Sequence, residues 1–281
     1  MKNIDEHLAA ITSTTNRPWE EVLIYNFLEA VLRRLSRSIY AKDLVLRGGM
    51  LTRLWVTPEK RVAVDVDFLG LYEFDIEVTR QIFLEILPIN DFADSVTFYI
   101  NSLQIKGIWL ETEFPGLRIN IDVALGEYQR NIQIDIGFDD PLVLPPEWVN
   151  YPTFLGDPVN LQAVRPETMV AWKIHGLVEL GPRRWRPKDL YDLLLYTEIP
   201  LDDAQLSSSI AVAFSSRNTP LQDVLEMLVA PDSWNNSKNR SQWRWYQRKA
   251  PTQVIPEDFL SVVTAVTNRW YGVTSLALQK M

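Results

Sequence analysis

The stretch that decides the fold is Arg61-Val62-Ala63-Val64-Asp65-Val66-Asp67-Phe68. Successive side chains of a strand point to opposite faces, so the apolar residues share one face and the two aspartates share the other. The two carboxylates then lie roughly 7 Å apart, and their repulsion costs on the order of 2 kcal/mol at an effective dielectric of about 20. A solvated edge strand tolerates this cost. A divalent cation between the carboxylates removes it, and Mg²⁺ favours one or two carboxylates plus substrate phosphates.

A glycine pair, Gly48-Gly49, precedes this strand in the sequence. It follows the short apolar run Leu44–Leu46 and precedes a helix-like segment, Met50–Trp55. Backbone N–H groups at such a strand-to-helix turn can hold a phosphate, and glycine lets the phosphate approach the main chain. A plain turn is the alternative interpretation.

A metal site of this kind needs a third acid on a neighbouring strand. Asp122 and Asp135 both lie in alternating apolar segments, and periodicity does not choose between them. Three carboxylates beside a phosphate fit two metal ions that clamp the attacking and leaving oxygens of an in-line displacement.

The wider pattern predicts a mixed α/β half followed by a helical half. Strand-length alternating segments occur at 62–69, 96–100, 105–111, 117–125 and 131–138, and helical spacing occurs at 19–36 and 76–87. Five prolines fall between Pro141 and Pro158, so the domain boundary is placed near residue 155. Further helices are expected at 166–180, 188–197, 202–214, 221–228 and from 256 to the end. We therefore expect a mixed β-sheet domain over residues 1–155 and an all-helical domain over residues 156–281.

Composition excludes several classes of protein. The 281 residues contain no cysteine and only two histidines, His7 and His175, which rules out disulfides, thiolate zinc sites and cysteine nucleophiles. Neither a GxxxxGK[ST] loop nor a GxGxxG motif occurs. The net charge of −8 argues against non-specific coating of nucleic acid, although a local basic groove stays compatible with it. The N-terminus does not resemble a signal peptide and no apolar run is long enough to cross a bilayer, so a cytoplasmic protein is expected.

Two basic groups of residues lie in the second half. One lies between two predicted helices, and the other, within residues 237–250, contains no acid and alternates with Trp243, Trp245 and Tyr246. Cations that meet phosphates and rings that stack on bases suit single-stranded or terminal RNA, whereas a solvated helix face with its rings in the core is the structural alternative. The candidate RNA contacts are Arg183, Arg184, Arg186, Lys188, Arg244 and Arg248.

Several blocks, in order over about residues 44–196, resemble the AbiEii family of nucleotidyltransferase toxins, within the DNA polymerase β-type nucleotidyltransferase superfamily. The blocks are residues 46–51, 61–70, 133–140, 151–153, 166–173 and 186–193. The resemblance implies a nucleotidyltransferase domain followed by a helical domain, and transfer of nucleotides from an NTP, in some relatives onto the 3′ end of tRNA. It also implies a toxin of a toxin–antitoxin or abortive phage infection system, with an antitoxin as partner.

The resemblance also assigns roles to residues, and it selects Asp135 over Asp122. Mg²⁺, or Mn²⁺, would be held by Asp65, Asp67 and Asp135, and the nucleotide by Gly48, Gly49, Arg61 and Lys173. Asp189 would be the late acid of the site, so that the catalytic set is Asp65, Asp67, Asp135, Lys173 and Asp189. Three positions depart from the family pattern, namely Ala63 where Ser or Thr is usual, Trp172 where Glu is common, and Asp139 where Gly is usual.

Two alternatives to RNA as the acceptor follow from the same residues. The protein would nucleotidylate a protein target, or it would be a catalytically silent member that binds nucleotide or a partner. The intact triad of aspartates argues against the silent alternative, and Trp172 argues for it.

Overall fold

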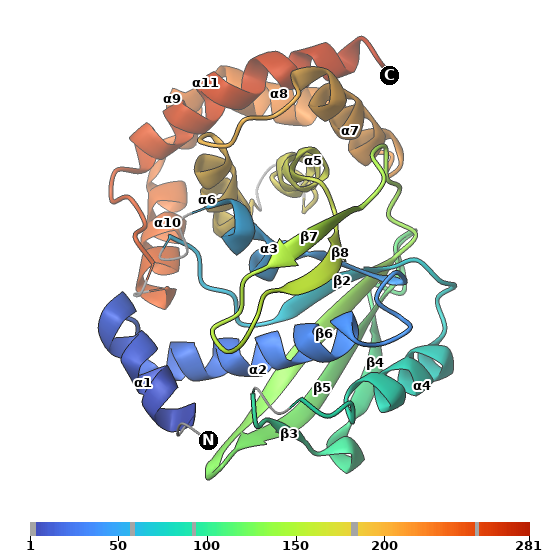
Figure 1. Cartoon of the computed structure of the whole chain (residues 1–281). Coiled ribbons are helices and arrows are strands. Elements are labelled where there is room, and N and C mark those ends of the chain that lie inside the picture. The colour runs from blue at the N-terminus through green and yellow to red at the C-terminus, as the bar shows by residue number, and fades with distance from the viewer. Residues whose placement is uncertain (1–3, 57–59, 92–93, 181–184, 251–252) are drawn as a thin grey trace. The chain divides into compact units, whose positions relative to one another are not determined.

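The computed structural model describes residues 4–56, 60–91, 94–180, 185–250 and 253–281 (Figure 1). The chain divides into two compact units. The first contains Met1–Leu54, Val62–Asp140 and Pro146–Ala163, and the second contains Trp55–Arg61, Pro141–Pro145 and Val164–Met281. The boundary expected near residue 155 falls inside the last segment of the first unit.

An eight-stranded mixed sheet forms the centre of the first unit, in the order β3-β5-β6-β2-β1-β8-β7, with β4 also paired to β5. Strand β2 pairs parallel with β6, β1 pairs parallel with β8, and the other pairs are antiparallel. The strands are β1 (Leu44–Arg47), β2 (Val66–Gly70), β3 (Thr97–Phe98), β4 (Gln104–Ile108), β5 (Gly116–Leu125), β6 (Tyr128–Phe138), β7 (Glu147–Tyr151) and β8 (Val159–Ala163).

Most predicted strands are found, with two differences. Strand β2 begins only at Val66, so Asp65 lies just before the strand. Strands β7 and β8 were not predicted, because Pro152 and Pro158 interrupt the region in which their alternating burial occurs. The expected fold class, a mixed α/β region followed by helices, is confirmed.

Helices α2 (Trp19–Ser36) and α4 (Ile76–Ile86) pack against the sheet, and α1 (Ile4–Thr15) packs against α2. Helix α4 begins where the side chain of Asp75 accepts hydrogen bonds from the backbone N–H groups of Glu77 and Val78. The apolar sheet residues Phe68, Ile134 and Ile136 are fully buried. One face of the sheet is therefore the hydrophobic core of the unit.

Buried charges on α2 fix the loops that surround it. Arg33 donates to Asp91, and Arg34 donates to Asp94. Glu29 accepts from the backbone N–H of Phe154 at 2.7 Å and faces Arg53. Burial raises the pKa of Glu29 to about 7, against the opposing effect of Arg53.

This raised pKa predicts a pH dependence of stability. Because the folded pKa of Glu29 lies above its usual value of 4.5, the stability that the protonated group contributes is lost as the pH rises from about 4.5 to 7. Relative to Glu29→Gln, the wild type should lose up to about 3 kcal/mol over this interval. Urea unfolding of both proteins between pH 4.5 and 8 measures the difference, and parallel stability curves would contradict the assignment.

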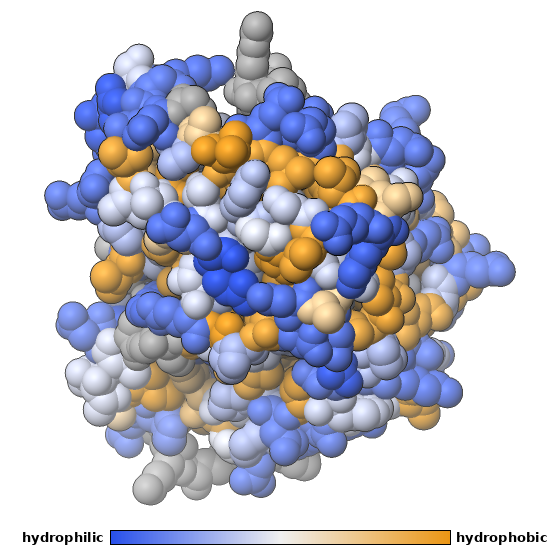
Figure 2. Space-filling view, turned by 90° about the horizontal axis from the view of Figure 1, so that it is seen from above, coloured by the Kyte–Doolittle hydropathy of each residue, from blue (hydrophilic) through white to orange (hydrophobic). Residues whose placement is uncertain are grey.

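The second unit is helical. It consists of α5 (Pro166–Gly176), α6 (Pro187–Tyr196), α7 (Asp203–Ser215), α8 (Leu221–Val229), α9 (Pro231–Trp234), α10 (Ser237–Lys249) and α11 (Phe259–Leu278). Fully buried Trp243 and Trp270 contribute to its core. Among the described residues, no helix is both long enough and apolar enough to cross a membrane. The face shown in Figure 2 carries hydrophobic residues in patches that hydrophilic residues interrupt.

Candidate functional site

Asp65, Asp67 and Asp135 converge in the first unit. One carboxylate oxygen from each lies within 4.8 Å of the other two. Asp135 is 4% exposed. Asp65, just before β2, and Asp67, within β2, are partly exposed. We call these three side chains the carboxylate triad.

The register of the sheet explains the convergence. Strands β2 and β6 are parallel neighbours, and Asp67 lies directly beside Asp135. Residues that lie opposite each other on paired strands project from the same face. Asp65 lies just before the strand, and its carboxylate comes close to the same two acids. The triad therefore lies on the sheet face opposite to the buried apolar residues.

The alternative third acid lies elsewhere on this sheet. Asp122 on β5 pairs in register with Asn131, whose side-chain amide donates to its carboxylate at 2.8 Å. It is exposed and is not part of the triad. The structure therefore brings Asp135, and not Asp122, to the two aspartates of the β2 segment.

Gly48 is in direct contact with the triad. It is the first residue of α3 (Gly48–Trp55), immediately after β1, and its φ of +70° lies in the left-handed region that favours glycine. A Cβ atom at this position would lie 1.9 Å from Oδ2 of Asp67. Glycine is thus needed both for the backbone conformation and for the close approach of the turn to the carboxylate. Gly49 follows it within the first turn of α3 and is buried.

Arg118 on β5 is a site residue that the sequence analysis did not identify. Its Nε donates to Oδ1 of Asp135 at 2.8 Å, and its Nη2 donates to Oδ2 at 2.7 Å. The hydrogen bonds to Asp135 raise the pKa of Arg118, and the negative charges of Asp65 and Asp67 add to this effect. Only the pairing of β5 with β6 in register reveals this contact, since the two residues are 17 positions apart.

The donor set of the triad fits a hard divalent cation. All three groups are carboxylates, which are the ligands that Mg²⁺ and Mn²⁺ prefer. Oδ1 of Asp135, which accepts from Arg118, retains a further lone pair, whereas Oδ2 accepts from both Arg118 and Gln133. The triad with Arg118 combines three negative charges and one positive charge, so a cation would still be attracted to it.

Lys173 of α5 belongs to a buried network of charges in the second unit. Its Nζ lies 2.7 Å from Oδ1 of Asp189 and 2.9 Å from Oδ2 of Asp192. Arg61 donates from Nε to Oδ1 of Asp192 at 2.7 Å. The exposed fraction of the side chain is 15% for Lys173, 6% for Asp189, 2% for Arg61 and 0% for Asp192. Lys173 is therefore held by acids and does not extend into solvent.

These contacts shift the pKa values of the network in opposite directions. Burial alone would lower the pKa of Lys173, but Asp189 and Asp192 raise it well above its usual range. Burial alone would raise the pKa of Asp192, but Arg61 and Lys173 lower it to about 2. Both groups remain charged at neutral pH.

The close packing of α5 against α6 requires a glycine as well. A Cβ atom on Gly176 would lie 2.5 Å from Oδ2 of Asp189. Asp189 lies in the first turn of α6, where a negative charge is favourable next to the helix N-terminus. The backbone of α5 and the dipole of α6 together place this carboxylate beside Lys173.

The basic residues expected at an RNA surface fall into three groups. Arg183 and Arg184 lie outside the described residues. Arg186 forms an ion pair with Glu179 at 2.6 Å, and Lys188 is half-buried in the first turn of α6. Arg244 and Arg248 are exposed on α10.

Helix α10 separates its aromatic residues by face. Trp243 is fully buried and Tyr246 is 9% exposed, and both pack with Tyr191. Trp245, in contrast, is 52% exposed. Trp243 and Tyr246 are therefore core residues, as the structural alternative to RNA stacking predicted. Trp245 instead lies on the solvent side of α10 together with exposed basic residues, namely Lys238, Arg240, Arg244, Arg248 and Lys249.

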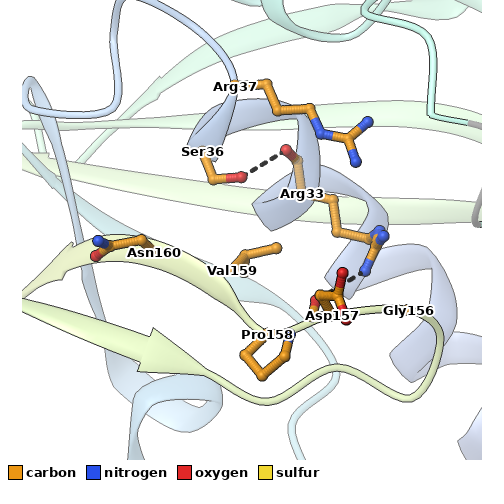
Figure 3. Close-up of a pocket in the computed structure, with 8 residues that line it drawn as sticks. All are labelled: Arg33, Ser36, Arg37, Gly156, Asp157, Pro158, Val159 and Asn160. Carbon is orange, nitrogen blue, oxygen red and sulfur yellow. Dashed lines mark hydrogen bonds between the residues drawn. The ribbon is translucent and has the colours of Figure 1, made fainter.

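A pocket of about 300 Å³ in the first unit contains none of the predicted site residues (Figure 3). The guanidinium of Arg33 lies at its edge and donates to the carbonyl oxygens of Leu155 and Asp157, which fixes the loop before β8. The positive charges of Arg33 and Arg37 are balanced by Asp157 in the lining and by Asp91, with which both arginines form ion pairs. Its residues are Arg33, Ser36, Arg37, Gly156, Asp157, Pro158, Val159 and Asn160.

The mixed sheet, the clustered aspartates and the glycine turn agree with a nucleotidyltransferase fold, and comparison with known proteins identifies the family. The family model described as nucleotidyl transferase AbiEii toxin, type IV toxin–antitoxin system, matches residues 30–265. The chain therefore belongs to the AbiEii family, as the sequence motifs suggested, and is a nucleotidyltransferase toxin of a type IV toxin–antitoxin system. A toxin of this type has an antitoxin as partner, and its enzyme class uses an NTP.

Two solved structures share the fold. A crystal structure from Helicobacter pylori, described as a candidate nucleotidyltransferase, has a TM-score of 0.55 and 13% identity, with 94% of this chain and 97% of that chain covered. JHP933 from Helicobacter pylori has a TM-score of 0.54 and 14% identity, with 92% of each chain covered. Comparison with curated protein sequences finds no significant match.

Proposed function

We propose that this protein transfers a nucleotide from an NTP to RNA, with the 3′ end of a tRNA as the favoured acceptor, in a reaction that depends on Mg²⁺ or Mn²⁺. The observation that carries the proposal is the convergence of Asp65, Asp67 and Asp135 beside the Gly48 turn. Catalysis of phosphoryl transfer consists mostly of positioning and charge neutralisation. The glycine turn would position the phosphates, and a metal ion held by the acids would neutralise their charge.

The triad would hold the metal, with Asp65 and Asp67 as ligands and Asp135 as support. When bound, Mg²⁺ would neutralise the charge that develops on the phosphoryl oxygens. Asp135 would accept the proton of the attacking 3′-hydroxyl. The hydroxyl oxygen then forms a bond to the α-phosphorus of the NTP, the bond from this phosphorus to the bridging oxygen breaks, and pyrophosphate leaves with the electron pair.

The triphosphate would be bound by backbone N–H groups at Gly48 and Gly49 and by Lys173. An ammonium group has three donors, of which one donates to Asp189, while Asp192 lies within ion-pair distance. A remaining donor of this ammonium group would suit a phosphate oxygen. Asp189 and Asp192 would act as positioning residues that orient Lys173. Arg61, proposed as a nucleotide contact on the resemblance, would act through Asp192, to which its buried Nε donates.

The choice of RNA over a protein acceptor is supported by α10. Its exposed residues carry only positive charges among the ionisable groups, and the exposed Trp245 lies among them. Basic side chains and an exposed ring suit the phosphates and bases of an RNA. Incubation with each labelled NTP, Mg²⁺ and either total RNA or total protein tests the acceptor. Label in RNA is expected, and label only in protein would overturn the proposal.

The double substitution Arg244→Ala and Arg248→Ala should weaken tRNA binding and reduce its salt dependence. Each lost phosphate contact flattens the slope of log affinity against log salt concentration by about one unit. Binding of tRNA to both proteins at several salt concentrations gives the two slopes. Equal slopes would show that neither arginine contacts a phosphate, and an Arg80→Ala variant on α4 serves as a control for loss of a surface charge.

A further inference from the structure

The sheet face that carries the triad is polar well beyond the triad. On β5 and β6, the residues that alternate with the buried core positions include Asn120, Asp122, Asn131 and Gln133, which are half-buried or exposed. The opposite face carries the apolar core, with Ile119 and Ile134 fully buried. These polar residues are therefore accessible to solvent, in contrast to those of the core face.

A row of charged residues crosses this face perpendicular to the strands. Successive strand pairs place Lys106 of β4 opposite Arg118, Arg118 opposite Asp135, Asp135 beside Asp67, and Asp67 opposite Arg47 of β1. The Gly48 turn follows Arg47 directly. The triad thus lies between the Gly48 turn on one side and the β5–β4 surface on the other.

The chemistry of the reaction indicates which substrate lies on each side of the triad. In an in-line displacement, the attacking oxygen and the leaving oxygen lie on opposite sides of the phosphorus atom. If the leaving pyrophosphate lies at the Gly48 turn, the attacking hydroxyl must approach from the β5–β4 side. The acceptor end must then lie over Arg118 and Lys106.

Trp109 provides an aromatic surface on that side. It follows β4, is 48% exposed, and has a φ of +56°, which is unfavourable for a tryptophan. A Cβ atom on Gly116 would lie 2.8 Å from Cε3 of this indole. A Cβ atom on Gly116 would point to the same sheet face as the side chain of Arg118, because the two residues are two positions apart on β5. The indole of Trp109 therefore lies on the polar face, beside the row of charges.

The glycine at 116 has a counterpart on the neighbouring strand. Gly116 pairs in register with Gly137, and a Cβ atom on Gly137 would lie 2.2 Å from Nη2 of Arg47. Two adjacent positions without side chains thus leave room for the indole and for a guanidinium next to the triad. Strained backbone conformations such as that of Trp109 cluster at active sites and ligand-binding sites.

We propose that Trp109 and Lys106 form the subsite for the end of a single-stranded RNA acceptor. The terminal base stacks on the indole of Trp109, and Lys106, which is exposed, binds a phosphate of the last nucleotides. The 3′-hydroxyl then points to Asp135. This subsite rests on the proposed transfer to RNA and extends it by naming the residues that receive the acceptor.

Binding of tRNA to the full chain carrying Asp67→Asn tests the subsite without turnover. In this background, Trp109→Ala should lower the affinity about tenfold, because stacking contributes this much per base. Trp109→Phe should retain most of the affinity, since it keeps an aromatic face. Trp148→Ala is the matched control, because Trp148 is 52% exposed on β7, at the opposite end of the sheet.

A second probe locates the contact on the RNA. A tRNA that lacks its last three nucleotides should bind equally well with or without Trp109, whereas the substitutions at Arg244 and Arg248 should weaken the binding of both RNAs. Lys106→Gln should lower the salt slope by about one unit, and Lys42→Gln, also an exposed lysine of the first unit, should leave it unchanged.

Equal affinities of the Trp109→Ala and Trp148→Ala variants would overturn the subsite, even if the wild type labels RNA. A loss of affinity at Trp109 that is the same for intact and truncated tRNA would also overturn it, since the ring would then contact another part of the RNA. If the wild type labels no RNA, the proposed acceptor fails first and the subsite fails with it. Equal thermal midpoints of the variants exclude unfolding as the cause of any difference.

Discussion

Replacement of Asp67 by Asn is expected to reduce nucleotide transfer by about three orders of magnitude while the protein stays folded. Metal stabilisation of transition-state charge contributes several kcal/mol, and about 1.4 kcal/mol corresponds to a factor of ten in rate. Asp67 is the member of the triad that contacts the Gly48 turn, with Oδ2 1.9 Å from the position of a Cβ there. Asparagine keeps the shape that fits this turn but removes the charge that attracts a cation.

The same substitution should leave the thermal midpoint unchanged or raise it in the presence of a chelator. Without a divalent cation, three carboxylates with oxygens within 4.8 Å repel one another, and removal of one charge reduces this repulsion. The measurements are the initial rate of label transfer and the melting curve with and without Mg²⁺. A Mg²⁺-induced rise in the midpoint should occur in the wild type and be small in the variant.

Asp122→Asn is the matched control, because it also removes one carboxylate from the same sheet. Asp122 contacts Asn131 and not the triad, so transfer should proceed at the wild-type rate. Loss of activity in both variants would mean that net charge, and not the triad, limits the reaction. Full activity of Asp67→Asn would remove Asp67 from the metal site.

The comparison of Asp122 with Asp135 shows where sequence reasoning ends. Both acids lie in alternating segments, and periodicity identifies the face of a residue but not its neighbours on other strands. The pairing of Asp67 with Asp135 depends on β2 and β6 being parallel and in register, which is a non-local property. The family resemblance supplied this choice before the structure did.

Local signals predicted the elements in which they were strong. The helical spacings at 19–36 and 76–87 have their counterparts in α2 and α4. Strands β7 and β8 were missed because prolines obscure their short alternation. Arg118 and Trp109 were missed for a different reason, since each acquires its role from a residue of another strand or loop, and no pattern within its own segment marks it.

Substitution of Asp192 by Asn should destabilise the second unit by about 3–5 kcal/mol, because removal of one partner of a buried ion pair leaves its counter-charges uncompensated. Asp192 is fully buried between Arg61 and Lys173. Unfolding by urea, followed through the far-ultraviolet signal of the helices, measures the loss.

The control for Asp192 is an exposed ion pair of the same unit. Lys60, next to Arg61, pairs with Glu198 at 3.0 Å, with side-chain exposures of 32% and 68%. Glu198→Gln should therefore change the stability by less than about 1 kcal/mol. Similar losses from the two substitutions would show that burial does not set the strength of the network around Asp192.

A pH series gives an independent measurement of the same network. Because the folded pKa of Asp192 is lowered to about 2 from its usual 3.8, its charge contributes stability that is present above about pH 4 and is lost as the pH falls towards 2. The wild type should therefore lose more stability over this interval than Asp192→Asn does. If Asp192→Asn fails to fold, the Arg61→Gln and Asp192→Asn double variant replaces it, because removal of both charges of a pair costs less than the sum of the single losses. Where the two single variants also fold, additive losses would show that Arg61 and Asp192 do not stabilise each other.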